Sequence, residues 1–410
     1  MKSLYLQRYA YPKQLIADPP PNDLEMAVVI PCYHEPQLLE TLASLHHCTP
    51  PSGPLEVIVV VNDSAKDHHD IKVQNQNTLV EAQSWVRQIQ SPLHYRILYE
   101  SLPAKHAGVG LARKVGMDEA VRRFSKPGNE GVIICLDADC LVDPNYLVAV
   151  ESHFKQHPKS PGCSIYYEHP LEGPLEPSVY EGILAYELHL RYYTHALRYA
   201  GHPFAFQTVG SSMAVRSSAY QKQGGMNKRK AGEDFYFLQD IFLLGNFSEL
   251  KSTRVIPSPR ASNRVPFGTG KAISCWLNNP TPTLDTYNPL IFSNMKYFIS
   301  KLPDMISGEI SPLWDQLPSS IQGFVGKLKY LEKINEIRAN TSNQQSFQKR
   351  FFQWCNGFFA FKFAHYARDH FYSQVEVTEA AAWVLREHYG IEPKSQPRDL
   401  LQQLRKLDKA

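Results

Sequence analysis

At 410 residues the chain is long enough for two or three ordinary domains, or for one large α/β domain with an appended region. Its composition, with 43% hydrophobic and 20% charged residues, is that of a globular protein with a substantial core. Lysine plus arginine exceed aspartate plus glutamate only slightly, 43 against 40. This balance gives no reason to expect nucleic acid or a strongly acidic partner.

The N-terminal residues and the cysteines predict where the protein resides. The opening stretch, MKSLYLQRYAYPKQL, lacks the apolar core of a secretory signal, and no window approaches eighteen uncharged apolar residues. The seven cysteines are scattered and include no CxxC pair, which argues against a zinc site or a disulfide framework. We therefore expect a cytoplasmic protein with reduced cysteines.

The first 140 residues alternate between apolar runs and amphipathic segments. Short β-branched runs predict buried strands, and apolar residues at every third or fourth position predict helices. Strands are expected within 25–31, 54–61, 94–100 and 131–136, and helices within 37–48, 70–90 and 107–124. This alternation indicates βαβ units and a mainly parallel sheet, whose ligands bind at the carboxyl ends of the strands.

The second half of the chain is less regular. A long aromatic helix is expected over 180–201, a helix that opens on acidic residues over 232–245, and a further strand over 252–260. Beyond about residue 275 the periodicity is helical. The chain is therefore expected to contain an N-terminal extension (1–24), an α/β domain (25–275) and a helical C-terminal region (276–410).

Paired aspartates follow the strand VIIC. Asp137 and Asp139, in LDADC, place two hard carboxylates at a strand end, where they can hold a divalent cation that binds a diphosphate. A solvated loop is the alternative, since aspartates also initiate turns. Asp63 follows the second predicted strand and is expected at the same edge of the sheet.

A second acidic pair, Glu233 and Asp234, begins the helix predicted over 232–245. Acids in a first helical turn are ordinary, because they complement the helix dipole. The functional alternative is a carboxylate that accepts a proton from an incoming hydroxyl.

Aromatic residues recur every three or four positions in SFQKRFFQWCNGFFAFKFAHYARDHFY, residues 346–372. The pattern is typical of a core helix packed on two sides. The alternative is an interfacial helix that places Lys349, Arg350, Lys362 and Arg368 against lipid headgroups.

Taken in chain order, these segments resemble the family 2 glycosyltransferases of the GT-A fold. The matching stretches are AVVIPCYHEP, VIVVVNDS, KHAGVGLARKVGMDEA, ICLDADCLVDP and GEDFYF, which together span Ala27 to Pro257, more than half of the chain. The resemblance implies a Rossmann-like α/β domain with a mixed, mainly parallel sheet flanked by helices, followed by the helical C-terminal region.

The resemblance also implies roles for individual residues. Asp139 would ligate the Mg²⁺ or Mn²⁺ that bridges the two phosphates of a nucleotide-diphospho-sugar. Asp234 would be the general base of an inverting transfer, supported by Glu233. The stretch RVPFGTGKA resembles the mobile basic loop that some members place over the diphosphate. The donor would be contacted by Pro31, Tyr33, Glu35, Asp63, Lys105, Asp137, Arg264 and Lys271.

Several departures from the family pattern narrow the expected function. His34 stands where the family often has asparagine, and NDS replaces the commoner DDGS, so the choice between UDP- and GDP-linked donors stays open. No QxxRW is found after the acidic pair, and no membrane span is predicted, so one or a few sugars per acceptor are expected rather than a polymer.

The function expected from the sequence is a metal-dependent, inverting, non-processive glycosyltransferase. Its acceptor would be a glycan, a lipid or a small molecule, and the alternative of an interfacial helix would add peripheral contact with the inner face of a membrane. The rival hypotheses are a catalytically silent nucleotide- or sugar-binding scaffold and a nucleotidyltransferase of similar sheet architecture. The sequence does not determine the oligomeric state.

Overall fold

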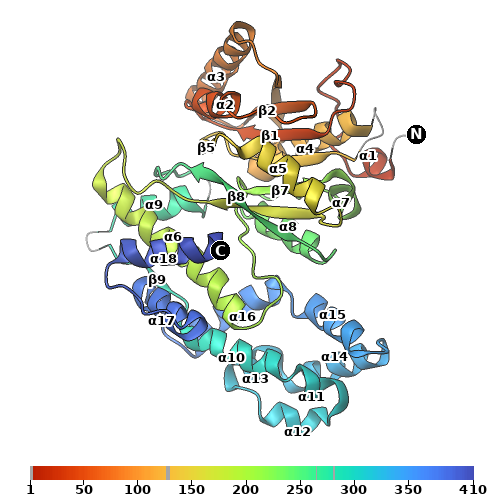
Figure 1. Cartoon of the computed structure of the whole chain (residues 1–410), viewed down its shortest axis with the longest axis vertical. Helices are drawn as coiled ribbons and strands as arrows, with labels where there is room; N and C mark the ends of the chain where they lie inside the picture. The colour runs from red at the N-terminus through yellow and green to blue at the C-terminus, as the bar shows by residue number, and fades with distance from the viewer. Residues whose placement is uncertain (1–2, 126–129, 265, 280–281) are drawn as a thin grey trace. The chain divides into compact units, whose positions relative to one another are not determined.

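The computed structural model describes residues 3–125, 130–264, 266–279 and 282–410, and these form two compact units (Figure 1). Unit 1 comprises Met1–Tyr180, Thr208–Cys275 and Asp408–Ala410, and unit 2 comprises Glu181–Gln207 and Trp276–Leu407. The domain expected over 25–275 is therefore not continuous. Glu181–Gln207 belongs to unit 2, where Tyr192 donates a hydrogen bond to the carbonyl of Tyr287 at 2.8 Å.

Unit 1 is built on an eight-stranded mixed sheet in the order β3-β2-β1-β4-β7-β6-β8-β5. The pairings β1–β2, β1–β4, β2–β3 and β6–β8 are parallel, whereas β4–β7, β6–β7 and β5–β8 are antiparallel. The strands are β1 (Met26–Cys32), β2 (Leu55–Ser64), β3 (His94–Leu102), β4 (Val132–Cys135), β5 (Cys140–Val142), β6 (Gly162–Tyr167), β7 (Met213–Arg216) and β8 (Ser248–Pro257).

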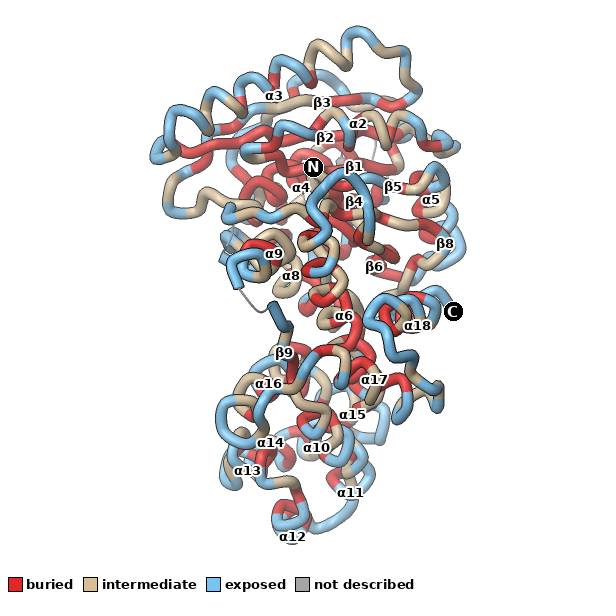
Figure 2. Tube along the Cα trace, turned by 90° about the vertical axis from the view of Figure 1, so that its left-hand side faces the viewer, coloured by how far each residue is buried: buried red, intermediate tan, exposed pale blue. Residues whose placement is uncertain are grey.

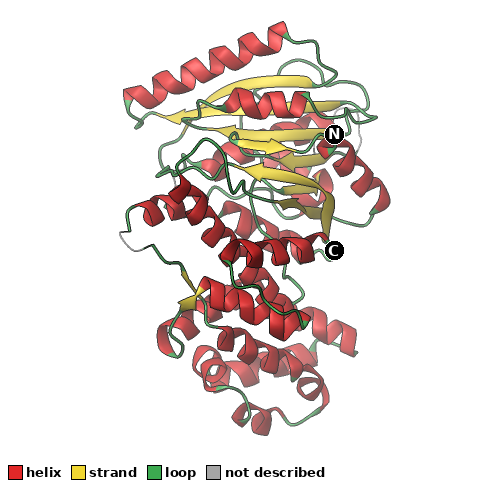
Figure 3. Cartoon of the chain, turned by 60° about the vertical axis from the view of Figure 1, so that its left-hand side comes forward, coloured by secondary structure: helices red, strands yellow, loops and turns green. Residues whose placement is uncertain are grey.

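Helices flank this sheet, as expected for the fold class (Figure 3). They are α1 (Leu4–Arg8), α2 (Leu38–His46), α3 (His69–Gln88), α4 (Val109–Ser125), α5 (Tyr146–Gln156), α7 (Ser217–Lys222), α8 (Glu233–Phe242) and α9 (Thr269–Leu277), the last of which ends in unit 2. Every residue of β1, β2 and β4 is buried (Figure 2), which agrees with the mostly apolar sequences of these strands.

Helix α4 packs closely on β1 and β2. Its Gly116 has no room for a side chain, since a Cβ there would lie 2.5 Å from Val29 Cγ1 and 3.2 Å from Val60 Cγ2. The opposite part of α4 holds the N-terminal residues. Asp118 accepts hydrogen bonds from the Tyr5 hydroxyl at 2.5 Å and from the backbone of Tyr11 at 2.7 Å. The extension over 1–24 is thus part of unit 1.

The described residues of unit 2 are helical apart from loops and one short antiparallel pair, β9 (Asp285–Thr286) and β10 (Val375–Glu376). Its helices are most of α6 (Pro177–Tyr199), then α10 (Pro289–Ser300), α11 (Leu302–Ser307), α12 (Ile310–Asp315), α13 (Ser319–Val325), α14 (Lys327–Ala339), α15 (Gln344–Trp354), α16 (Gly357–His370), α17 (Val377–Tyr389) and most of α18 (Pro397–Lys409). Among the described residues, no helix is both long and apolar enough to span a bilayer.

The aromatic stretch over 346–372 forms two helices rather than one. Helix α15 ends at Trp354, and α16 begins after Asn356, whose side chain accepts a hydrogen bond from the backbone of Phe359 at 3.1 Å. Phe347 and Phe351 are buried within unit 2, as a core role requires. Lys349 and Lys362 are exposed, so contact of this surface with lipid stays a prediction.

Candidate active site

The carboxyl ends of three parallel strands meet at one edge of the sheet in unit 1. Strand β1 lies between β2 and β4, with Cys32 opposite Val61 and Val29 opposite Cys135. The residues that come directly after β1 and β4 therefore emerge at the same edge. At this edge Glu35 and Asp139 lie close enough to share the guanidinium of Arg260.

A single buried arginine joins the acidic residues of two elements. Arg113, on α4, donates a hydrogen bond to Asp137 Oδ1 at 2.8 Å and another to Glu233 Oε1 at 3.3 Å. A third N–H of Arg113 bonds to the carbonyl of Gly210 at 3.0 Å. Burial disfavours the charge of this guanidinium, but Asp137 and Glu233 raise its pKa above the ordinary value. Arg113 therefore remains a cation and holds the start of α8 beside the loop after β4.

Glu233 and Asp234 differ in exposure although they are adjacent. Glu233 is buried, whereas Asp234 is partly exposed and its Oδ1 accepts a hydrogen bond from the backbone of Phe235 at 2.7 Å. Burial and the charge of Asp234 raise the pKa of Glu233 to about 7, although Arg113 opposes them. Burial also raises the pKa of Asp234. Asp234 is thus the residue of this pair that has surface exposed to solvent.

Gly210 leaves the space beside Asp234 open. A Cβ at this position would lie 3.1 Å from Asp234 Oδ2 and 2.9 Å from the Nη2 atom of Arg113. A larger residue would press on both charged groups. The glycine at this position is therefore explained by its close packing against the acidic cluster.

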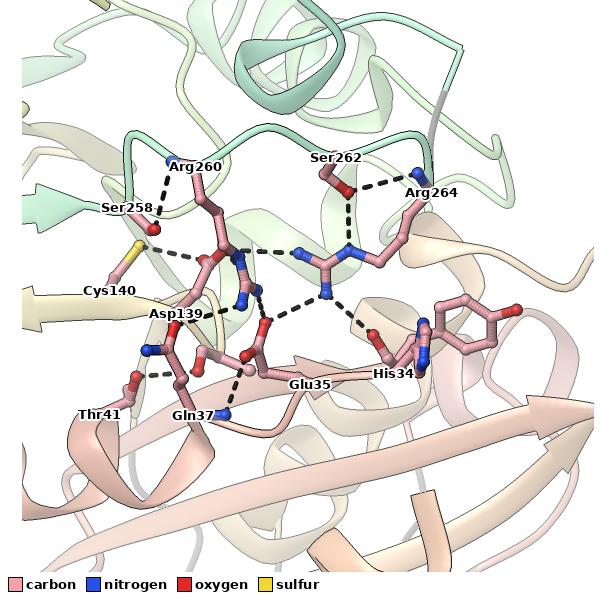
Figure 4. Close-up of polar contacts among 12 residues, drawn as sticks. His34, Glu35, Gln37, Thr41, Asp139, Cys140, Ser258, Arg260, Ser262 and Arg264 are labelled. Atoms are coloured by element: carbon pink, nitrogen blue, oxygen red, sulfur yellow. Dashed lines mark hydrogen bonds and ion pairs between the residues drawn. The ribbon is translucent and has the colours of Figure 1, made fainter. Parts of the chain in front are cut away.

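Two arginines that come after β8 lie over Glu35 and Asp139 (Figure 4). Arg260 forms an ion pair with Glu35 and lies 3.2 Å from Asp139 Oδ2. Arg264 lies 3.1 Å from Glu35 Oε2 and 3.5 Å from Asp139 Oδ2, and it also donates to the carbonyl of Tyr33 at 3.0 Å. Both guanidinium groups thus contact the same two carboxylates.

The charged groups of this second cluster shift one another's pKa values. Burial and the neighbouring Asp137 raise the pKa of Asp139 to about 6, while Arg264 lowers it. Burial and the charge of Arg264 lower the pKa of Arg260 to about 10. Glu35 is 1% exposed, so its carboxylate depends on these partners and on the backbone N–H of Gln37, from which it accepts a hydrogen bond at 3.0 Å.

Asp63 lies within β2, not in a loop after it as the sequence suggested. The strand continues to Ser64 because β3 keeps pairing with it, with Asp63 opposite Ser101. Its Oδ2 accepts a hydrogen bond from the hydroxyl of Tyr99 at 2.6 Å. Its Oδ1 is buried and has no hydrogen-bond partner among the residues that the structure describes. A buried acceptor of this kind calls for a donor, which a ligand can supply.

The chain was compared with families, curated proteins and solved structures. Residues 27–221 match the family model described as "Glycosyl transferase family 2". This chain carries a family 2 glycosyltransferase domain. No curated protein matches the chain.

Solved structures of S. aureus TarS are similar to this glycosyltransferase at low identity. TarS 1-349 in complex with UDP-GlcNAc is 13% identical, with a TM-score of 0.41, over 81% of this chain and 91% of that one. TarS 1-349 without a named ligand is 16% identical, with a TM-score of 0.39, over 94% and 90%. The family assignment rests on the family match and not on these structures.

The glycosyltransferase offers few protein ligands for a metal ion. Among the described residues, no group of three or more histidine, cysteine, aspartate or glutamate side chains is arranged to hold one. Mg²⁺, however, is commonly held by one or two carboxylates, substrate phosphates and water. The partly exposed carboxylate of Asp139, with Asp137 two residues before it, fits this role. The donor set is therefore suited to a cation that arrives with a diphosphate.

The remaining predicted donor-binding residues come from β1 and the loop after it, from the turn before α4, and from α9. Pro31 is buried in β1, and Tyr33 and Glu35 come after that strand. Lys105 is exposed in the turn between β3 and α4. Lys271 is on α9, where its ammonium donates to the side chain of Asn263 at 3.3 Å.

Two residues of the site, Arg113 and Arg260, escaped the sequence analysis. Arg113 is part of the quoted stretch GLARKVG, but a helical arginine is usually solvated, and only the packing of α4 shows that this one is buried. Arg260 precedes Arg264 by four residues in PRASNR. The occurrence of two basic residues directly after a strand could have indicated that Arg260 belongs to the site.

Proposed function

We propose that this glycosyltransferase moves a sugar from a UDP- or GDP-linked nucleotide-diphospho-sugar to an acceptor hydroxyl, with inversion at the anomeric carbon. The observation that carries the proposal is Asp234, a partly exposed residue whose pKa is raised by burial of its carboxyl group, next to Glu233, which Arg113 joins to Asp137. A general base works best when its pKa lies near the working pH.

In the proposed reaction Asp234 accepts the proton of the acceptor hydroxyl. The hydroxyl oxygen then forms a bond to the anomeric carbon from the face opposite the diphosphate. The bond between that carbon and the diphosphate oxygen breaks, and the nucleoside diphosphate leaves with the electron pair. One displacement on the opposite face inverts the configuration. Glu233, buried beside Asp234, supports the base through its charge and its contact with Arg113.

The leaving diphosphate needs positive charge. Asp139 would hold Mg²⁺ or Mn²⁺ here, and the cation would offset charge on the departing group. Arg260 and Arg264 now share Glu35 and Asp139, so two guanidinium groups already lie where anionic oxygens bind. If Asp139 held the cation, Arg260 and Arg264 would be able to turn their N–H groups toward the phosphates. Lys271 belongs to the same basic segment, residues 258–271.

The nucleoside would bind over the carboxyl ends of β1 and β2. The unpartnered Oδ1 of Asp63 would accept a hydrogen bond from the base or ribose. Tyr33 and the buried Pro31 would adjoin the nucleoside, and Asp137 would lie near the ribose or sugar. Lys105, at the entrance of α4, would add positive charge beside the donor. Because uracil and guanine both present N–H donors, the structure supports either nucleotide.

The acceptor is proposed to be a glycan, a lipid or a small molecule that receives one or a few sugars. A cytoplasmic location, with peripheral contact at the inner face of a membrane, stays a prediction. The family match favours glycosyl transfer over nucleotidyl transfer, while a catalytically silent scaffold is an outcome of the experiment below.

The test is hydrolysis of a panel of UDP- and GDP-sugars in the presence of Mn²⁺, measured as release of nucleoside diphosphate. We expect turnover that falls about 10²–10⁴-fold in Asp234→Asn, the range for loss of a general base. Asp139→Ala should abolish the dependence on Mn²⁺. Binding of Mn²⁺ in the presence of UDP or GDP, measured by electron paramagnetic resonance, should weaken in Asp139→Ala and persist in Asp234→Asn.

Tight nucleotide binding without turnover across the whole panel would favour the scaffold. If turnover is the same with and without Mn²⁺ and is unchanged in Asp139→Ala, the proposed metal site is wrong. The assignment of Asp234 as the base would then be judged from Asp234→Asn alone.

A further inference from the structure

A cavity of about 330 Å³ lies between two helices of unit 2. It is lined by Lys333, Glu336, Ile337, Arg350, Gln353 and Trp354. The first three residues are on α14 and the last three on α15, in each case at the spacing that places them on one helix face. The volume falls at the lower end of the range for small-ligand pockets, which is about 300–1,000 Å³.

Trp354 gives this cavity a fixed aromatic wall. Its indole packs edge-on against Phe351 and Phe359, with ring centroids 5.6 and 5.2 Å apart, and against Phe298 at 6.3 Å. Three neighbouring rings thus restrain the indole, yet Trp354 is only partly buried. A restrained, accessible indole is suited to stacking against the C–H face of a sugar ring, since it loses little conformational entropy on binding.

The polar groups around the indole are unequally paired. Lys333 and Glu336 form an ion pair at 2.5 Å and largely compensate each other. Arg350 is exposed and has no hydrogen-bond or ion-pair partner in the part of the chain that the structure describes. The cavity therefore has one uncompensated positive charge next to an aromatic wall, together with the amide of Gln353 and the carboxylate of Glu336 for hydroxyl groups.

We propose that the groove between α14 and α15 binds a saccharide unit that carries a negative charge. The sugar ring would lie against Trp354, its phosphate or carboxylate would pair with Arg350, and its hydroxyls would bond to Gln353 and Glu336. The inference rests on the proposed function in one respect, that such a unit would belong to a glycan acceptor. Unit 2 would then hold the acceptor through a sugar distinct from the one that reacts.

The test uses the full-length chain and three probes, glucose 1-phosphate, glucuronate and glucose, with binding measured by isothermal titration calorimetry. Saturating nucleoside diphosphate and Mn²⁺ are present to block the donor site. We expect at least one anionic probe to bind about tenfold or more tightly than glucose, the range for hydrogen bonds to a charged group. Binding of both anions would indicate recognition of charge alone, and binding of one would identify phosphate or carboxylate as the group recognised.

Variants of α15 locate the binding. Arg350→Gln should reduce the affinity for the anionic probe to that for glucose, while Lys349→Gln, the same change at the exposed neighbouring position, should leave it unchanged. Trp354→Leu should weaken all probes, and Trp354→Phe, which keeps a ring against the three phenylalanines, should preserve folding and part of the affinity. Equal affinities for all three probes, no binding at all, or an Arg350→Gln protein that behaves like wild type would overturn the proposal.

The two proposals fail separately. Hydrolysis of the donor in Arg350→Gln should equal that of wild type. If wild type hydrolyses no nucleotide-sugar but still binds an anionic saccharide through Arg350, the proposed function fails and the saccharide site remains.

Discussion

The two arginine–carboxylate clusters of unit 1 contain the same chemical groups and have opposite characters. Arg113 comes from the middle of a sheet-packed helix, its side chain is 1% exposed, and its carboxylate partners raise its pKa. Arg260 and Arg264 come from a segment directly after a strand, their side chains are 22% and 28% exposed, and burial with mutual repulsion lowers the pKa of Arg260 to about 10.

The difference shows that the element carrying an arginine decides what its ion pairs can do. The backbone of α4 is fixed by packing on β1 and β2, so Arg113 can only hold Asp137 and Glu233 in place. The segment after β8 lies outside regular secondary structure, although Ser262 is bonded to Gly270 and Ser274. We therefore expect its arginines to exchange a carboxylate for a phosphate. One cluster is thus expected to govern stability and the other to govern donor binding.

The largest effect is expected from Arg113→Met. Removing one partner of a buried ion pair leaves uncompensated charge and costs about 3–5 kcal/mol, so we expect the free energy of unfolding, measured with urea, to fall by this amount. The matched control is Arg87→Met, an exposed arginine of α3, which should change stability by less than about 0.5 kcal/mol. A loss below about 1 kcal/mol in Arg113→Met would mean that the buried cluster does not stabilise the unit.

An intermediate effect is expected in the pH dependence of stability. The pKa of Glu233 is raised by folding to about 7, so the folded state holds this proton more tightly than the unfolded state. Its contribution is full below the ordinary glutamate pKa and is lost as the pH rises through about 7. Wild type should therefore lose on the order of 3 kcal/mol relative to Glu233→Gln between these limits, measured by urea unfolding at several pH values. Glu81→Gln, at an exposed position of α3, should show no such trend.

The smallest stability change is expected from Arg264→Gln. Arg260 remains paired with Glu35 in this variant, and partly exposed ion pairs contribute about 0–1 kcal/mol. Donor affinity is the sensitive measurement. Loss of one charged hydrogen-bond donor to phosphate should weaken binding of the nucleotide-sugar about tenfold by calorimetry, whereas Lys159→Gln, an exposed lysine after α5, should not. If Arg264→Gln destabilises the protein as strongly as Arg113→Met, the contrast between the clusters is wrong.

The sequence predicted the parts of the site that depend on local pattern. Parallel strands bring their carboxyl ends together whatever the rest of the chain does, so the edge that carries Asp137 and Asp139 could be predicted from periodicity. Glu35 was singled out only by the resemblance to the family. The end of β2 could not be predicted, because polar residues such as Asp63 usually mark the end of a strand. Here the strand continues past Asp63 because it still pairs with β3. The sequence predicted a helix where α6 lies. It did not predict that most of α6 belongs to unit 2, because that assignment depends on tertiary contacts.

The split between α15 and α16 had a signal that the sequence analysis overlooked. The dipeptide Asn356-Gly357 interrupts the aromatic pattern, and asparagine is a favoured N-cap. The burial of Arg113 had no comparable signal, because its partners come from residues 24 and 120 positions away.

The attachment of the N-terminal residues to α4 has a practical consequence for where the enzyme begins. The family match starts at Ala27, which invites cloning from that residue. Such a protein would lack Tyr5 and Tyr11, leaving the buried carboxylate of Asp118 short of two hydrogen-bond donors. The same helix carries Arg113 one and a half turns earlier. A protein that begins at the first residue of the family match would therefore hold Arg113, and with it the acidic pair, less firmly. We expect the smallest active enzyme to include the first two dozen residues.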